Sequence, residues 1–392
     1  MATQFDVVGV ELSKQTDQYA WDAISLNDRC RHITVCNDCD SRTLHQAELY
    51  RRISDALGPL KLDAVAINGW SDNGALASLR WCKDNDVPAI AMSESNATDF
   101  ERSRSRERVK RCLVANFSSA LVGGSLSYKY INYLGMPHEG ISQGYDIVDN
   151  AHFTPPGEAG KANWRNTVGV SRPYFLASNR FIEKKNLPRL LEAFADYRER
   201  HCLQIKTSVT AEPELGQNPT PEPFDLVLLG DGPQKRLLVE LGKDLGIANS
   251  VHYPGFKQYN ELPHYYWGAS VFIHASTTEQ WGLVINEAMA AGLPVIASDR
   301  CGSVADLVEN GKNGIVFSPQ DTKAMADAML SLATDDELRE DMGNQSAARI
   351  TAWGPDRFAS GMQEAVNNAI RRPINASWID RMVLEGICRL KY

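Results

Sequence analysis

The sequence predicts an α/β protein with two doubly wound domains that face each other across a cleft. The chain has 392 residues, more than a single hydrophobic core usually organises. Short apolar runs alternate with amphipathic helical stretches in two separate series. Runs that are apolar almost throughout suit strands buried on both faces, as in a parallel sheet covered by helices. Ligands of such sheets bind beyond the carboxyl ends of the strands.

The first series predicts an N-terminal domain over residues 1–155. Two amphipathic stretches, Leu44–Leu57 and Gly74–Asn85, have the apolar spacing of helices that cover a sheet. The predicted strands are Phe5–Leu12, His32–Cys36, Leu62–Asn68, Val87–Ser93 and Ala120–Gly123. The regular alternation of strand and helix favours parallel pairing with helical crossovers.

The second series predicts a C-terminal domain over residues 174–370, after a hinge at residues 156–173 that is rich in proline and glycine. Its predicted strands are Tyr174–Ser178, Leu226–Leu229, Val251–Tyr253, Val271–His274, Pro294–Ala297 and Gly314–Phe317. The predicted helices from residue 187 onward include Leu187–Arg200, Gln234–Leu245, Pro355–Arg371 and Ala376–Lys391. We interpret residues 206–224 as an exposed polar loop and residues 371–392 as a helical extension.

Composition and charge argue against several classes of protein. A formal net charge of −8 disfavours nucleic acid as a partner, because bulk attraction would require the opposite sign. No apolar run approaches the ~20 residues that span a bilayer. The first residues, Met1–Val10, lack the basic start of a signal peptide. We therefore expect a cytoplasmic protein.

The cysteines indicate reduced thiols. All eight are scattered along the chain, as expected for the cytosol. Cys36 and Cys39 form a C-x-x-C pair, but no second pair follows at the spacing of a zinc site. We interpret these residues as buried thiols and predict no metal site.

The segment Val271–Val316 carries the strongest indication of chemistry. A predicted strand ends near His274, and after a polar turn a helix begins near Gly282. Free backbone amides at a helix start attract phosphate oxygens, and glycine lets a ligand approach the backbone closely. Glu279 lies just before these amides, and Glu287 lies on the helix itself. The two carboxylates can accept hydrogen bonds from hydroxyl groups around one anion pocket.

This segment resembles the signature of a known enzyme family. The sequence EQWGLVINEA, from Glu279 to Ala288, is similar to the E-x7-E motif of retaining GT-B glycosyltransferases of family 4, also called group 1. Further segments resemble the donor domain of that family: SNRFIEKKNLPRLLEAF, LLGDGP and AAGLPVIASDRCGSVADLV. The resemblance extends from about residue 120 to residue 369. It implies the GT-B fold, in which two Rossmann-like domains face a cleft.

The resemblance implies roles for the residues around the helix start. Glu279 would contact hydroxyls of the donor sugar, and Glu287 would hold the ribose. Gly282 and Leu283 would offer backbone amides to the diphosphate or to the sugar. Taken alone, Glu287 fits an exposed helix position equally well, and its context favours the ribose role.

Basic residues are expected to neutralise the diphosphate. Breaking a glycosyl–phosphate bond builds negative charge on the departing diphosphate, and fixed cations stabilise that charge. The resemblance implies this role for Arg180 and Lys185. Lys184 is the alternative to Lys185, and the spacing from Arg180 favours Lys185.

Two glycine turns complete the predicted donor site. Gly255 and Phe256 follow a predicted strand, at the place of the family's base-recognition loop. Gly230 lies in the LLGDGP segment and is interpreted both as a turn glycine and as a ligand contact.

The resemblance implies a retaining glycosyltransferase that moves a sugar from a UDP- or GDP-linked donor to an acceptor in polysaccharide or glycolipid synthesis. No cofactor or metal is expected, because fixed cations stabilise the charge of the departing diphosphate. The resemblance also implies that the leaving phosphate takes the proton of the acceptor, so that no protein nucleophile is required. Two alternatives stay open. One is another GT-B enzyme, such as a sugar epimerase or phosphorylase, and the other is a nucleotide-sugar-binding protein without efficient transfer. The sequence does not identify the base, the sugar, the acceptor, the linkage or the oligomeric state.

The acceptor side departs from the family's pattern. After the strand at Ala89–Ser93 the family usually has a histidine, and this chain has Glu94. Glu94 either replaces that histidine contact or packs at a helix end. Gly144 and Asp146 match the family's G-x-D turn before the hinge.

The segment Arg102–Arg111 contains six basic residues. A solvated helix face is the simplest interpretation of such a run. The alternative is a patch for an anionic membrane or for a lipid-linked diphosphate acceptor. This alternative predicts peripheral contact with the inner face of a membrane.

The start of the chain raises a separate hypothesis. Family members usually open with a strand, a glycine-rich loop and a long helix, but no such loop follows FDVVGVELS. Counted back from the hinge, Phe5–Leu12 falls at the family's second strand. We hypothesise that the first strand–loop–helix unit is missing. The alternative makes Phe5–Leu12 the first strand and Gln18–Asn27 a divergent first helix.

Overall fold

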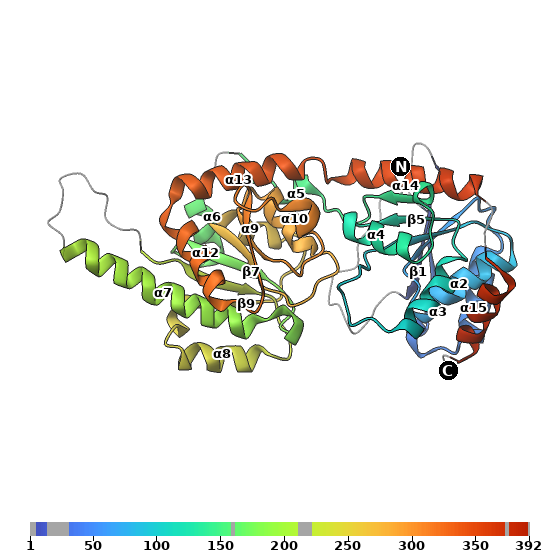
Figure 1. Ribbon diagram of the computed structural model, residues 1–392, viewed down its shortest axis with the longest axis horizontal. Helices are drawn as coiled ribbons and strands as arrows, with labels where there is room; N and C mark the ends of the chain where they lie inside the picture. The colour runs from blue at the N-terminus through green and yellow to red at the C-terminus, as the bar shows by residue number, and fades with distance from the viewer. Residues whose placement is uncertain (1–4, 14–30, 158–160, 211–221, 373–375, 391–392) are drawn as a thin grey trace. The chain divides into compact units, whose positions relative to one another are not determined.

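The computed structural model describes the chain except for residues 1–4, 14–30, 158–160, 211–221, 373–375 and 391–392 (Figure 1). It divides into two compact units. The first unit contains residues 1–146 together with residues 356–392, and the second contains residues 147–355. Both units are built on parallel sheets, so the predicted α/β class is confirmed.

The first unit holds two parallel sheets. One has four strands in the order β3-β4-β5-β6, and the other pairs β1 with β2. The strands are β1 (Val8–Ser13), β2 (Arg31–Cys36), β3 (Val65–Asn68), β4 (Ala89–Ser93), β5 (Ser119–Val122) and β6 (Ile141–Gln143). Leu12 and Val35 of the smaller sheet pack against the same hydrophobic core as Ile67 and Ala91 of the larger one.

Helices follow the strands in the predicted alternation. They are α1 (Gln46–Leu57), α2 (Asn73–Asp84), α3 (Arg104–Val114), α4 (Ser125–Tyr133), α14 (Pro355–Arg371) and α15 (Trp378–Leu390), with short 3-10 turns at Ser41–Thr43 and His138–Gly140. Asp72 caps α2 by accepting a hydrogen bond from the Ala75 amide. The apolar stripes of α1 and α2 supply Leu49, Ile53 and Leu76 to the core.

The two C-terminal helices belong to the first unit, which corrects the prediction that the C-terminal domain continues to residue 370. Gly361 of α14 lies against β6, where an added Cβ would come within 2.1 Å of the Gln143 carbonyl oxygen. The Ser119 hydroxyl donates to the Ala365 carbonyl at 2.7 Å. An amphipathic pattern predicts a helix, but it does not say which of two cores the helix covers.

The hypothesis about the start of the chain stays a prediction. β1 pairs with β2 in parallel, with Val10 opposite Ile33, and the larger sheet begins at β3. The alternative helix at Gln18–Asn27 falls outside the described residues.

The second unit contains one parallel sheet in the order β12-β11-β10-β7-β8-β9. Its strands are β7 (Tyr174–Ser178), β8 (Asp225–Leu229), β9 (Val251–Gly255), β10 (Val271–His274), β11 (Val295–Ser298) and β12 (Gly314–Phe317). Its helices are α5 (Asn150–Phe153), α6 (Lys161–Val168), α7 (Leu187–Thr210), α8 (Lys235–Asp244), α9 (Leu262–Gly268), α10 (Leu283–Ala290), α11 (Val304–Leu307), α12 (Thr322–Thr334) and α13 (Asp336–Ile350), with short 3-10 turns at Glu183–Lys185 and Ala248–Ser250.

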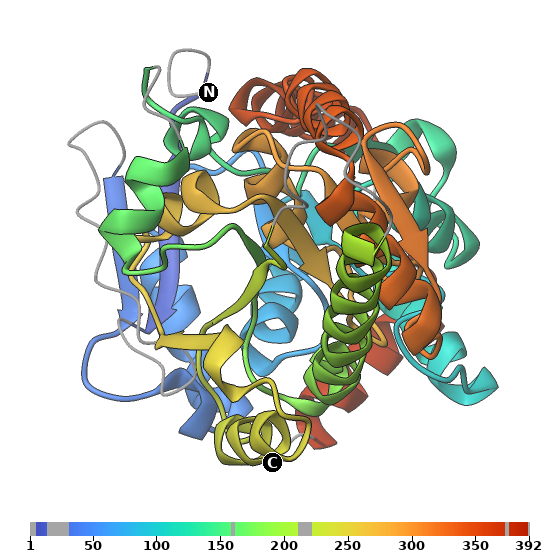
Figure 2. The ribbon, with the colours of Figure 1, turned by 90° about the vertical axis from the view of Figure 1, so that its left-hand side faces the viewer.

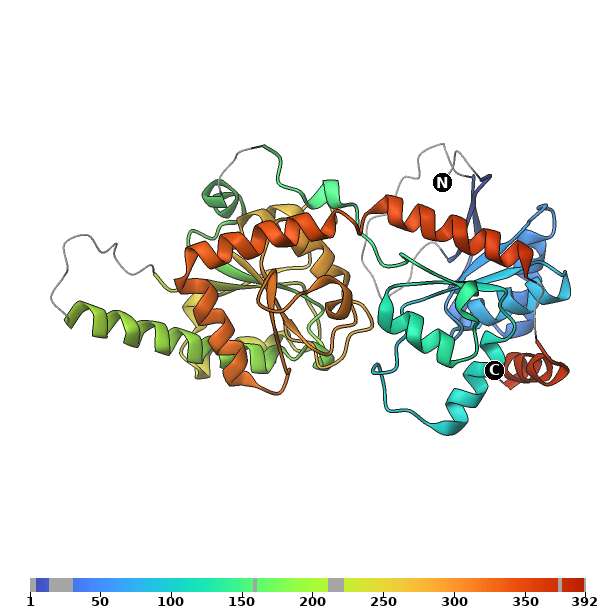
Figure 3. The ribbon, with the colours of Figure 1, turned by 45° about the horizontal axis from the view of Figure 1, so that its top comes forward.

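Hydrophobic cores cover both faces of this sheet. Alternate residues of β7 point to opposite sides, so Phe175 enters one core and Leu176 the other. α7 and α12 pack side by side over one face, as Figures 2 and 3 show. The burial of both faces explains why the strands are apolar almost throughout.

Two predicted loops are partly helical. α6 (Lys161–Val168) lies within the predicted hinge, and Arg165 fixes it to α9 by donating to the Gly268 carbonyl at 3.0 Å. α7 continues to Thr210, into the segment predicted to be a polar loop, while residues 211–221 lie outside the described ranges. Tertiary contacts stabilise α6 where the sequence shows no helical periodicity.

Candidate active site

The turn between β10 and α10 is shaped by one glycine and one tryptophan. Gly282 caps α10 with φ of 94°, in the left-handed region that favours glycine. Trp281 is fully buried, and its indole N–H donates to the Asn286 side-chain oxygen at 2.9 Å. The buried Trp281 and its hydrogen bond to Asn286 therefore fix the start of α10 against the core. Leu283 is 40% exposed.

The backbone of Glu279 is held by the neighbouring loop after β11. Its amide donates to the Arg300 carbonyl at 3.0 Å, and its carbonyl accepts from the Gly302 amide at 3.0 Å. The Ser303 amide then donates to the Trp281 carbonyl at 3.1 Å. These bonds give the Glu279 side chain a defined direction before any ligand binds.

The Glu279 carboxylate lies among three basic side chains. It forms an ion pair with Lys185, and it lies 3.4 Å from the Lys184 nitrogen and 3.6 Å from His274 Nε2. Burial opposes ionisation, but the neighbouring imidazole of His274 and the charge of Lys185 hold the pKa of Glu279 far below its usual range. The carboxylate is therefore ionised at every physiological pH.

A short 3-10 turn, Glu183–Lys185, brings the two lysines to this position. The Lys184 carbonyl accepts from the Thr277 amide at 2.8 Å, which ties the turn to the loop after β10. Asn186 ends the turn with φ of 58°, and its side-chain amide donates to the Ala275 carbonyl at 3.1 Å. The Lys185 side chain is 13% exposed and that of Lys184 is 43% exposed. The geometry thus favours Lys185 as the buried cation, and its role stays a prediction.

Glu287 lies on α10, about one helical turn after Leu283 at the start of the helix. The hydroxyl of Tyr266, on α9, donates to its carboxylate at 2.5 Å. Burial raises the pKa of Glu287 to about 7, and the hydrogen bond from Tyr266 acts in the opposite direction. Glu279 and Glu287 thus differ in ionisation, because the first has cationic partners and the second has a neutral phenol.

The remaining predicted residues lie on neighbouring loops at the carboxyl edge of the sheet. Gly230 has φ of 126°, and an added Cβ would come within 1.9 Å of the Asn179 carbonyl oxygen. The Gly230 amide donates to the Gly255 carbonyl at 3.0 Å, which joins the loops after β8 and β9. Arg180 directly follows Asn179 on the loop after β7, and Phe256 beyond Gly255 is 42% exposed.

Three residues close to this site were not predicted as site residues. His274 is fully buried, and its Nε2 lies 3.1 Å from the Ser276 hydroxyl as well as near Glu279. Tyr266 is fully buried against Glu287. Asn179 is 9% exposed, and within the described ranges neither polar atom of its amide has a partner. A polar residue at the end of an apolar strand was the available signal for His274 and Asn179.

The predicted acceptor-side residues form a second polar group in the first unit. Burial, followed by the charge of Glu94, raises the pKa of Asp146 to about 8. The Glu94 carbonyl accepts from the Ser127 hydroxyl at 2.9 Å. Gly144 has φ of 112°, and an added Cβ would come within 2.8 Å of the Arg357 carbonyl oxygen. The positive φ and the nearby Arg357 carbonyl thus explain why glycine occupies position 144.

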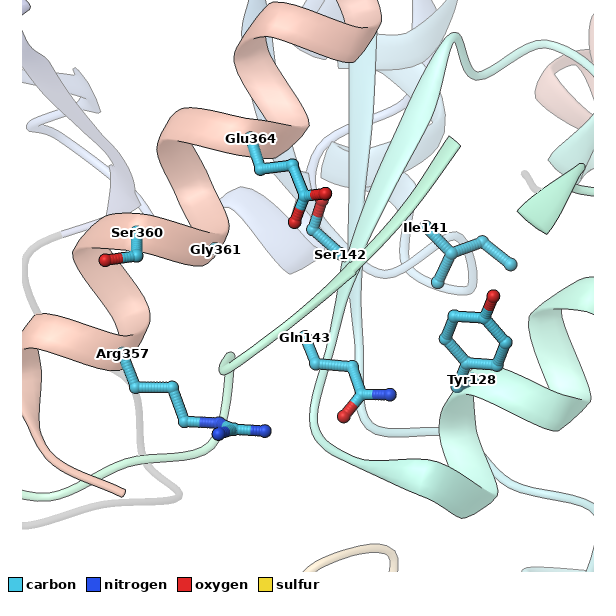
Figure 4. Close-up of a pocket in the computed structure, with 8 residues that line it drawn as sticks. All are labelled: Tyr128, Ile141, Ser142, Gln143, Arg357, Ser360, Gly361 and Glu364. Atoms are coloured by element: carbon cyan, nitrogen blue, oxygen red, sulfur yellow. The ribbon is translucent and has the colours of Figure 1, made fainter. Parts of the chain in front are cut away.

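A pocket of about 400 Å³ opens beside β6 in the same unit (Figure 4). Its walls come from α4, β6 and α14, and they are formed by Tyr128, Ile141, Ser142, Gln143, Arg357, Ser360, Gly361 and Glu364. The lining side chains include hydroxyl, amide, guanidinium and carboxylate groups. Such a mixed lining suits a ligand with both donors and acceptors.

The described residues contain no group of three histidine, cysteine, aspartate or glutamate side chains able to hold a metal ion. Cys36 is buried, Cys39 is partly buried, and both are free thiols. Within the described ranges, none of the helices has the length and apolar composition needed to cross a bilayer.

The fold and the site together define a class of protein. Parallel-sheet units, a helix start with free amides, two carboxylates and a lysine pair at the sheet edge are the features of the GT-B class. Amides, cations and carboxylates in this arrangement can hold a diphosphate and the hydroxyls of a sugar.

Comparison with known proteins identifies the family. Residues 161–349, which lie within the second unit, match the glycosyl transferases group 1. D-inositol 3-phosphate glycosyltransferase of Corynebacterium urealyticum is 32% identical over 54% of this chain and 50% of its own length. A GDP-mannose-dependent phosphatidylinositol monomannoside mannosyltransferase of Mycobacterium tuberculosis is 28% identical over 55% of this chain and 53% of its own length. The chain therefore matches about half the length of these relatives.

A solved structure extends the likeness to the fold of both units. HepE from Anabaena, in complex with UDP and glucose, superimposes with a TM-score of 0.67 and covers 86% of each chain at 20% identity. The predicted family and the predicted GT-B fold are both confirmed.

Proposed function

We propose that the protein is a retaining glycosyltransferase that moves a sugar from a nucleotide-diphosphate sugar to an acceptor. The observation that carries this proposal is the ionised Glu279 paired with Lys185 beside the start of α10. The pair offers one cation for a phosphate oxygen and one anion for sugar hydroxyls. A match to the group 1 family over the same residues supports it.

The donor is bound by the carboxylates of Glu279 and Glu287 and by the backbone amides at the start of α10. Glu279 accepts hydrogen bonds from hydroxyls of the transferred sugar, and Glu287 accepts them from the ribose. The amides of Gly282 and Leu283 donate to the diphosphate, where the helix dipole adds a favourable field. Phe256, exposed beyond Gly255, offers an apolar surface to the base.

The chemical step breaks the bond between the sugar and the β-phosphate. Negative charge grows on the departing diphosphate, and Lys185 and Arg180 stabilise it as fixed cations. The acceptor hydroxyl attacks from the face that the diphosphate leaves, and a phosphate oxygen accepts its proton. The sugar keeps its anomeric configuration, and no protein nucleophile takes part.

The donor is proposed to be UDP- or GDP-linked, without a further cofactor. HepE was solved with UDP and glucose, and the mycobacterial relative is named for GDP-mannose. Both names support a nucleoside diphosphate as the leaving group of the donor. Whether the base is uracil or guanine is to be measured.

The acceptor is proposed to be lipid-linked and reached at the cytoplasmic face of a membrane. The name of the mycobacterial relative includes a phosphatidylinositol lipid. Only part of the basic segment Arg102–Arg111 is available for this contact. Arg102 and Lys110 lie against the buried Glu107, at 3.3 and 3.2 Å, and over the ring of Tyr130. The outer arginines of α3 remain for lipid phosphates.

A screen of nucleotide sugars tests the proposal. Each UDP- and GDP-sugar is incubated with the protein, and the released nucleoside diphosphate is measured with and without candidate polyol and lipid acceptors. We expect release that depends on one donor and falls strongly in Glu279→Gln, while Glu309→Gln, at an exposed position in the same unit, serves as the matched control. NMR of the product then gives its anomeric configuration. Binding without transfer for every acceptor would favour the alternative of a binding protein, and an inverted product would contradict retention.

A further inference from the structure

The C-terminal helix α15 carries large apolar side chains on both of its faces. Leu384 and Cys388 are buried in the core of the first unit. On the opposite side Trp378 is 69% exposed, Ile379 is 51% exposed and Met382 is 60% exposed. Met382 lies four residues after Trp378 and three after Ile379, and side chains at these spacings are neighbours on a helix surface, so Met382 joins the three into one ridge. We call them the apolar ridge.

The helix α15 that carries the ridge packs beside the basic helix α3. The side-chain amide of Asn116, just beyond α3, donates to the Asp380 carbonyl at 3.3 Å. At the other end of α15, the Cys388 thiol lies 3.8 Å from the Leu76 carbonyl oxygen, near the start of α2. The end of α15 thus lies at the start of α2, so the two helices run antiparallel, and α15 also packs beside α3 (Figure 1).

Exposed cations line the side of α3 that faces solvent. Arg104, Arg108 and Arg111 are exposed, in contrast to the basic residues held by Glu107. The Arg111 guanidinium lies 4.6 Å from the ring centre of Tyr133, which is itself 57% exposed. An apolar ridge with an aromatic residue at one end and arginines alongside is the pattern of a surface that enters a membrane interface.

We propose that α15 and α3 together dock the first unit on an anionic bilayer, with the apolar ridge inserted at the boundary of head groups and acyl chains. The arginines of α3 then bind lipid phosphates. This proposal rests on the lipid side of the proposed function and adds an inserted segment to it. The whole chain has a net charge of −8, so attraction to an anionic surface must come from a local patch.

Charge also decides between a membrane and a second copy of the chain as the occupant. Two copies that met through this surface would bring their α3 arginines together, and like charges would oppose the contact. Anionic lipid complements the arginines and receives the apolar ridge at the same time. Tryptophan in particular prefers the interface between head groups and acyl chains.

Sedimentation with lipid vesicles tests the proposal on the full-length protein. Vesicles containing phosphatidylglycerol are compared with pure phosphatidylcholine, at low and at high salt. We expect binding to the anionic vesicles that persists in part at high salt, because salt screens charges and leaves apolar insertion in place. Trp378→Ser combined with Met382→Ser should weaken binding at least about tenfold and remove the salt-resistant part. Ile370→Ser, at an exposed apolar position on α14, is the matched control and should bind like the parent.

Tryptophan emission provides a second measurement. Vesicle addition should shift the emission to shorter wavelength in the parent and much less in Trp378→Phe. Equal binding by the parent and the double variant, or loss of all binding at high salt, would overturn insertion. A parent that dimerises without vesicles and a double variant that is monomeric would identify a second copy as the occupant and also overturn it. Sugar transfer to a soluble acceptor does not depend on the ridge, so its loss would count against the proposed function instead.

Discussion

The two units of this protein are both built on parallel sheets, but they differ in the number of sheets and in where their polar groups lie. In the second unit one six-stranded parallel sheet is covered on both faces, and backbone hydrogen bonds join the loops at its carboxyl edge. In the first unit a four-stranded and a two-stranded sheet share a core, and its polar groups lie on helices and turns. The family match covers residues 161–349 and so falls in the second unit. The proposed donor site thus combines backbone turns fixed by hydrogen bonds with the paired side chains of Glu279 and Lys185.

The largest effect should come from removing the Glu279 charge. Glu279→Gln keeps the size of the side chain but leaves Lys185 without its anionic partner, and we expect turnover to fall at least about tenfold. Initial rates on an identified donor measure this, and circular dichroism checks the fold. Near-parental turnover would mean that the donor site lies elsewhere and that the contrast between the units is misplaced.

The lysine pair should show a smaller and asymmetric effect. Lys185→Ala removes the buried partner of Glu279, and a lost charge-assisted hydrogen bond to phosphate corresponds to about 1.5–3 kcal/mol. Lys184→Ala, at the more exposed position, should cost much less. Calorimetric titration with UDP and GDP compares them. Equal losses would show that the register between Arg180 and the lysines has been assigned wrongly.

Two glycine substitutions, one in each unit, should lower the free energy of unfolding and show whether the units unfold independently. Gly230→Ala forces a Cβ against the Asn179 carbonyl at a positive φ, and Gly361→Ala forces one against the Gln143 carbonyl. We expect losses of about 1–3 kcal/mol, with nucleotide binding weakened only by the first. Gly386→Ala, which meets no atom within 4 Å, is the control and should be neutral or stabilising. Thermal unfolding is monitored with and without nucleoside diphosphate. If the units were not independent, both variants would lose the same amount of nucleotide-dependent stabilisation.

The smallest effect should be on the pH dependence of donor binding. The pKa of Glu287 is about 7, and a carboxylate accepts ribose hydroxyls better than a carboxylic acid does. Donor affinity should therefore rise a few-fold as pH increases through about 7. Tyr266→Phe removes the hydrogen bond that lowers this pKa, so the midpoint should move to higher pH.

The same group gives a stability prediction of opposite sign. Its pKa is raised on folding from an ordinary value of 4.5, so the folded state retains a proton that the unfolded chain loses. Stability should fall as pH rises between about 4.5 and 7. Glu287→Gln should show neither dependence, and an unchanged pH profile of donor affinity in that variant would exclude Glu287 as the titrating group.

The sequence predicted what depends on short stretches of chain. A buried strand, a polar turn and a helix start follow one another around Glu279 and Gly282, and local spacing was enough to find them. His274 and Tyr266 could not be assigned in this way. Their contacts with Glu279 and Glu287 exist only because β10, α9 and α10 pack together.

Helices held by tertiary contacts were the other limit of prediction. α6 shows no periodic apolar pattern, and the hydrogen bonds of Arg165 to Gly268 and Ser270 hold it against α9. α14 was predicted as a helix, but its pattern could not reveal that Gly361 fits against β6 of the first unit. Helix propensity predicts that a helix forms, but the sheet against which it packs depends on complementary side-chain shapes.

The return of α14 and α15 to the first unit has a consequence for how the chain is made. Residues 147–355 form an insertion between two parts of the first unit, so that unit is discontinuous in the chain. During synthesis the middle unit leaves the ribosome complete, while the first unit still lacks the helices that cover β6 and pack beside α3. The first unit can therefore complete its core only after residues 356–392 have been synthesised, and until then α14 does not cover β6.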